Sequence, residues 1–183
     1  MAQDTIKPAR SISVTATPTL VWNADGTVDA TVEYEETASD PPMPGVVDRH
    51  TGDINLRKMP SNANYNFVVA LHITLDTSKM VDPQGNPVAG RFAQWSEAPM
   101  AGAGPVWLCK APGPGEARDT TPIYVLMMIL IRTSDTLVTI SDAVANDGPD
   151  YEFCLGLVLP DHGNRFITID PRITSKGVGQ DTR

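Results

Sequence analysis

The chain is poor in the residues that bind polyanions. It has only 14 Lys and Arg residues against 22 Asp and Glu residues, for a formal net charge of −8. Nucleic acids and anionic membrane surfaces are both bound through clustered basic side chains, so this composition argues against either as a partner. The longest apolar run, residues 123–131, is also too short to span a bilayer as a helix, which takes about 20 residues.

Cysteine is nearly absent. Cys109 and Cys154 are the only two in 183 residues, so the chain lacks the disulfide framework that staples small secreted domains. Both lie in apolar stretches, where buried thiols are common, and the sequence leaves open whether they pair. The first residues lack the apolar core of a secretory signal. These absences predict a soluble, cytoplasmic protein.

Histidines and nucleophile motifs are sparse as well. His50, His72 and His162 are separated by 22 and 90 residues, which is not the spacing of a zinc site. No Gly-x-Ser-x-Gly motif marks a nucleophile at a sharp turn. We therefore expect no metal and no cofactor, and the sequence favours a protein that is not an enzyme.

What the chain does have is strand periodicity. At the odd positions of residues 65–76 every side chain is apolar, from Tyr65 to Leu75, whereas His72, Thr74 and Asp76 stand among the even ones. Successive side chains of a strand point to opposite faces, so this pattern predicts a long strand with one face on a core. The other strands are expected at residues 11–22, 27–35, 53–57, 91–96, 106–109, 123–132, 136–140, 152–159 and 165–169.

Turn residues connect these strands. The chain contains 16 prolines and 14 glycines, and Asp25-Gly26 between two apolar runs predicts a hairpin. Pro18 has no N–H for a ladder, which predicts that the first strand is bent or at an edge there. Residues 123–132 are apolar on both faces, which predicts a central strand.

These patterns predict an all-β fold: a two-sheet antiparallel sandwich of about 8–10 strands, immunoglobulin-like in outline. Trp107 precedes both cysteines, so the Cys-Trp-Cys order of true immunoglobulin domains is not matched. We expect a flexible arm at residues 1–9, one domain at residues 10–174 and a frayed tail at residues 175–183.

Three functions are compatible with this chain. The first is a non-enzymatic module that acts through protein contacts or as a homo-oligomer, because edge strands and long loops are common contact surfaces. The second is a carbohydrate or other small-ligand binding module that uses Trp95, Trp107 and Arg91 near the proline- and glycine-rich residues 97–121. The third is a hydrolase with a site built from distant loops, using His50 or His162.

Overall fold

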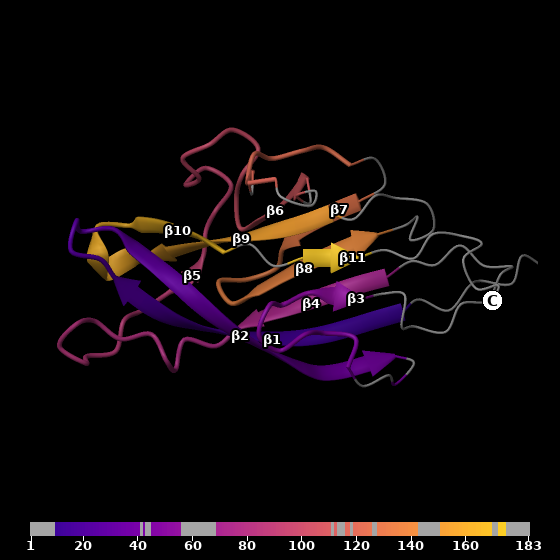
Figure 1. The fold of residues 1–183 in the computed structure, drawn as a ribbon, viewed down its shortest axis with the longest axis horizontal. Helices are drawn as coiled ribbons and strands as arrows, with labels where there is room; N and C mark the ends of the chain where they lie inside the picture. Colours follow the sequence, from indigo (N-terminus) through magenta and orange to yellow (C-terminus); the bar gives the residue numbers. More distant parts are fainter. Residues whose placement is uncertain are drawn as a thin grey trace, which may run out of the picture.

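The computed structural model (Figure 1) consists of β-strands joined by loops. It describes residues 10–142 and 151–174, except for 41, 43–44, 56–68, 111, 113–115, 118, 126–127 and 170–171. The expected arm at 1–9, the expected tail at 175–183 and the first part of the long strand predicted at 65–76 lie outside the described residues. Among the described residues, no helix is long and apolar enough to cross a membrane.

The first sheet, sheet A, has five strands in the order β2-β1-β4-β8-β7. They are β1 (Arg10–Trp22), β2 (Val28–Asp40), β4 (Val69–Leu75), β7 (Met128–Arg132) and β8 (Leu137–Asp142). The pair β1 and β4 is parallel, and the other neighbours are antiparallel. Sheet A is therefore mixed.

The second sheet, sheet B, is built around one long strand, β9 (Tyr151–Leu159). On one side of β9 are β10 (Arg165–Ile169) and β11 (Arg172–Thr174), with β3 (Ile54–Asn55) parallel to β11. On its other side are β5 (Arg91–Phe92) and β6 (Val106–Lys110). A short 3₁₀ helix, η2 (Pro160–His162), connects β9 to β10.

Both sheets contribute to one buried apolar cluster. Ile12, Val14, Leu71 and Ile73 of sheet A belong to the same cluster as Leu155 and its neighbours on sheet B. These residues alternate along their strands, as expected when each strand turns one face to a core. At one lateral margin β10 packs beside β2 (Figure 1), so two edge strands from different sheets come together there.

The outer face of β9 is covered too. Cys154 belongs to a second, smaller cluster with Ala103, Trp107 and Cys109, against which Phe166 packs. The loop before β6 is tied to β9, because Gly156 accepts a hydrogen bond from the Ala93 N–H and donates one to the Pro105 carbonyl. β9 is consequently buried on both faces.

The hairpin predicted at Asp25-Gly26 is confirmed, since β1 and β2 are antiparallel neighbours joined by residues 23–27. Gly26 has φ of +84°, a value that glycine adopts without steric cost. Pro18 is paired with Val32 of β2, but the register of β1 with β4 stops at Ala16. Pro18 therefore lies beyond the part of β1 that pairs with β4, so its missing N–H removes no hydrogen bond from that pairing.

Two fold predictions need correction. The fold is all-β with two sheets, but it is not purely antiparallel, because β1 and β4 run in the same direction, and an immunoglobulin-like topology is not shown. Residues 123–132 do not form a central strand. The strand in this range is β7, which stands at the end of sheet A in the part of the chain that the structure describes, with Ile129 and Ile131 exposed. The central strand with both faces buried is β9.

Because the Gly104 backbone packs closely on Gly156 of β9, we predict that Gly156→Ala is destabilising. A Cβ at this position would lie 2.7 Å from Phe166 Cζ and would collide with the Gly104 carbonyl oxygen. Because a backbone atom cannot move aside cheaply, we expect a loss of about 3 kcal/mol in the free energy of unfolding, measured in urea.

Gly90→Ala is the matched control. Its new methyl group would overlap only the far end of the flexible Met80 side chain, while Thr77 Cγ2 lies at an ordinary contact distance of 3.7 Å. We expect a loss of about 1 kcal/mol for this variant. Equal losses in the two variants would contradict the close packing of the Gly104 backbone on β9.

Candidate functional site

Two of the residues predicted to bind a ligand lie together at the start of the loop that covers β9. Arg91 of β5 donates from both guanidinium nitrogens to the Glu97 carboxylate, at 2.7 and 2.6 Å. Trp95 is 48% exposed, and its ring packs on Gly104. A Cβ added to Gly104 would collide with this ring. One side of this indole is therefore covered, and the arginine is already engaged in an ion pair.

The third predicted residue lies elsewhere. Trp107 of β6 is 1% exposed, packs near Phe166 with ring centroids 6.3 Å apart, and donates its indole N–H to the Thr120 carbonyl at 2.9 Å. A ring enclosed in this way presents no face to a sugar. Carbohydrate binding therefore stays a prediction that depends on Trp95 rather than on a pair of tryptophans.

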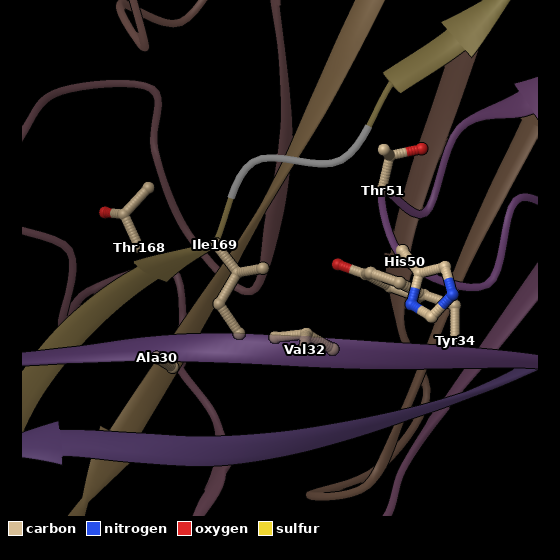
Figure 2. Close-up of a pocket in the computed structure, with 7 residues that line it drawn as sticks. All are labelled: Ala30, Val32, Tyr34, His50, Thr51, Thr168 and Ile169. Carbon is tan, nitrogen blue, oxygen red and sulfur yellow. The ribbon is translucent and has the colours of Figure 1, made fainter.

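The structure also has a pocket that the sequence did not reveal. It lies between β2, β10 and the turn at residues 48–51, with a volume of about 290 Å³ (Figure 2). It is lined by Ala30, Val32, Tyr34, His50, Thr51, Thr168 and Ile169. Figure 2 shows Ile169 pointing toward Val32, with Tyr34 and His50 together at the other end of the pocket. No local motif could have predicted it, because its walls are far apart in the sequence.

The turn that carries His50 is held by Asp48. The Asp48 carboxylate accepts the backbone N–H groups of His50 and Thr51 at 2.8 and 2.9 Å. These two bonds, first that from Thr51, lower the pKa of Asp48. The Tyr34 N–H of β2 donates to the Arg49 carbonyl at 2.9 Å, so the same turn is fixed to the edge of sheet A. His50 is therefore placed at the rim by a local hydrogen-bonded turn.

The three histidines lie in three different places. His72 is on the outer face of sheet A, with Nδ1 at 3.0 Å from Thr139 Oγ1. His162 is in η2, with its ring edge-on to Trp22 at a centroid distance of 5.0 Å. Within the part of the chain that the structure describes, no group of three or more His, Cys, Asp and Glu side chains is arranged to hold a metal ion.

Sheet A ends in an apolar strand that is open to solvent. Ile129 and Ile131 of β7 are 58% and 46% exposed, and Tyr124, in the segment leading to β7, is 87% exposed. We call Ile129 and Ile131 the β7 patch. Along the strand order of sheet A, β7 has β8 as its only neighbouring strand among the described residues.

The opposite end of sheet A has a different surface. β2 carries Asp29, Glu33 and Glu35 at exposed positions, whereas β7 carries no carboxylate. Lys79 donates a hydrogen bond to the Glu33 carboxylate at 2.7 Å. This hydrogen bond, and the positive charge of Lys79, lower the pKa of Glu33. Charged side chains on an edge strand discourage pairing with another chain. β2 has this protection, whereas the one charged residue of β7, Arg132, is ion-paired with Asp135 of the same chain.

The ion pair of Arg91 predicts a pH-dependent contribution to stability. The hydrogen bond from Arg91 is the main reason that the pKa of Glu97 falls from 4.5 to about 2, and the Gln94 N–H adds to it. Because this pKa is lower in the folded state, the stabilisation is present above about pH 4.5 and is lost as the pH falls toward 2. Glu97→Gln should therefore cost about 1–2 kcal/mol at pH 7, and progressively less as the pH falls below about 4.5.

Urea unfolding of both proteins between pH 7 and pH 3 measures this difference. Glu35→Gln removes one exposed carboxylate from β2 and controls for the change in net charge. A gap between wild type and Glu97→Gln that stays constant down to pH 3 would show that the ion pair does not stabilise the loop.

No family model, no curated protein and no solved structure matches this chain. The pocket, the β7 patch and the ion-paired loop are therefore the features of the molecule that bear on its function.

Proposed function

We propose that this chain is a non-enzymatic β-sandwich protein that acts by self-association, with the β7 patch as its contact surface. The sandwich is supported by the single buried cluster to which both sheets contribute. The contact surface is supported above all by one observation: the strand that ends sheet A exposes Ile129 and Ile131. Exposed apolar edge strands are templates for pairing with another chain.

A second copy of the same chain is the partner that we propose for this surface. Each copy carries a net charge of −8, so two copies repel each other over most of their surface. Strand β7 reads Met-Ile-Leu-Ile-Arg and brings no carboxylate to the contact. This is a place where like-charge repulsion is weak and apolar area is available.

The sequence of β7 also suits a two-fold contact. If two copies of β7 pair antiparallel about Leu130, Ile129 of one copy lies opposite Ile131 of the other. Cross-strand pairs of β-branched side chains favour such pairing. A two-fold contact uses the same patch twice, which satisfies the self-complementarity of a closed dimer. Because the patch is small, we expect a dissociation constant on the order of 10–100 µM.

Ile131→Lys tests this proposal. The substitution removes an exposed apolar side chain and adds a charge that lies near its equivalent in a two-fold dimer. We expect wild type to shift from monomer to dimer with rising concentration in sedimentation velocity. The variant should remain monomeric over the same range, with unchanged circular dichroism.

Val21→Lys is the matched control, because Val21 is an apolar residue on β1 that is 41% exposed. It adds the same charge outside the β7 patch and should dimerise like wild type. A wild type that stays monomeric at millimolar concentration would refute the proposed self-association. Equal loss of dimer in both variants would place the contact elsewhere.

Small-ligand binding is the second candidate, and the pocket between β2 and β10 favours it. Its Val32 and Ile169 side chains offer an apolar surface, and His50, Thr51 and Thr168 offer polar atoms at the rim. A few polar groups over an apolar surface are typical of small-molecule sites. Trp95 remains the candidate for a sugar contact, because its indole is half exposed.

A ligand-observed NMR screen with a set of monosaccharides and small aromatic alcohols separates these two sites. A ligand in the pocket should be lost in Val32→Phe, which fills the space, and retained in Trp95→Ala. A sugar stacked on the indole should show the reverse. If no compound binds wild type, or if both variants bind as wild type does, neither site serves this function.

A further inference from the structure

The two cysteines of the chain, 45 residues apart in sequence, are in contact in the fold. Cys109 Sγ lies 3.2 Å from Cys154 Sγ, and both residues are 0% exposed. Cys109 Sγ also lies 3.5 Å from the Glu152 carbonyl oxygen and donates to it. In the structure neither residue forms a disulfide.

Strand register brings these thiols together. In the antiparallel pairing of β6 with β9, Trp107 lies opposite Cys154 and Cys109 lies opposite Glu152. Cys109 and Cys154 are therefore diagonal neighbours on the same face, the outer face of sheet B. A disulfide bond measures about 2 Å, so bond formation requires the two sulfur atoms to approach by little more than about 1 Å.

The two thiols lie outside the main core, to which β6 contributes Val106 and Leu108. Both thiols belong to the small cluster with Ala103 and Trp107, on the opposite side of β9 from the cluster that joins the two sheets. β6 itself is short, and β9 is the only strand paired with it among the described residues, apart from a bridge from Leu108 to Ile123. Adjusting β6 therefore affects one short strand.

We propose that Cys109 and Cys154 form a cross-strand disulfide by exchange with a low-molecular-weight disulfide such as oxidised glutathione. One cysteine, as the thiolate, attacks a glutathione sulfur; a mixed disulfide forms and one glutathione leaves. The second cysteine then attacks the protein sulfur of the mixed disulfide and releases the other glutathione. Two protein thiols are oxidised, and one glutathione disulfide is reduced to two glutathione thiols.

Burial determines when this exchange takes place. Both thiols are enclosed in the folded protein, so a glutathione molecule reaches them while the chain folds or when β6 opens locally. Once the second thiol is beside the mixed disulfide, the contact seen here places it for attack. The bond is therefore expected to form on oxidative refolding and to be protected from reductants afterwards.

The disulfide should have two measurable consequences. It closes a loop between positions 45 residues apart, which restricts the unfolded chain and should raise the midpoint of thermal unfolding by about 5–10 °C. It also lies beside Trp107, whose partner in the register is Cys154. Because disulfides quench neighbouring indoles, the fluorescence of Trp107 should fall.

The experiment refolds the full chain from denaturant with reduced and oxidised glutathione, and in parallel with a phosphine reductant alone. Remaining thiols are then alkylated under denaturing conditions, and the intact mass and a non-reducing peptide map are recorded. The expected oxidised product has lost two hydrogen atoms, takes up no alkylating reagent and yields a peptide pair that links Cys109 to Cys154. The reduced product takes up two equivalents.

Cys109→Ser and Cys154→Ser are the matched controls, since each leaves one thiol and should show neither the thermal shift nor the loss of fluorescence. The proposal fails if wild type, refolded in the glutathione mixture to its native circular dichroism spectrum, is alkylated at both cysteines. It also fails if each cysteine carries a separate glutathione, or if the disulfide joins two chains instead of two strands.

Discussion

The burial of β9 on both faces is the constraint on which the rest of this fold depends. One face of β9 contributes Phe153, Leu155 and Leu157 to the core shared with sheet A. The other face carries Cys154 and Gly156, so sheet B needs a second cover. The loop before β6 supplies it, and the absence of a side chain at Gly156 lets the Gly104 backbone approach. Long loops in this protein therefore form part of the packing as well as the surface.

Sheet A follows a different rule. Its outer face has no second cover in the described residues, and its side chains are largely polar. One row across four strands runs from Ser13 through His72 and Thr139 to Ile131. The first three positions of this row are suited to water, and the last is not. The change from polar to apolar occurs on a single strand, which is why β7 stands out against the rest of the sheet.

Much of the strand content was predictable, because alternation and turn residues are local signals. The β1–β2 hairpin follows from Asp25-Gly26, and the buried face of β4 follows from the alternation that ends at Leu75. The position of a strand within its sheet is not a local property. Residues 123–132 and β9 both look like buried strands, yet only β9 receives a cover on each face.

The same limit applies to the candidate sites. Trp95 and Trp107 both flank the proline- and glycine-rich residues 97–121, but one packs on a glycine at the surface and the other is enclosed under a loop. The pocket between β2 and β10 depends on the meeting of two edge strands, which only the arrangement of the sheets determines. The contact between Cys109 and Cys154 depends on the register of β6 with β9. Sequence supplied these residues, and tertiary structure supplied their proximity.

Charge connects these observations to how the protein meets other molecules. A chain with a net charge of −8 resists close approach of a second copy wherever carboxylates are exposed, as on β2. A contact then forms where repulsion is weakest, even if the apolar area there is modest. β7 meets this condition through its composition, because its one charged residue, Arg132, is directed toward the Phe92 carbonyl and Asp135 of the same chain. The location of the patch, more than its size, thus determines where self-association can occur.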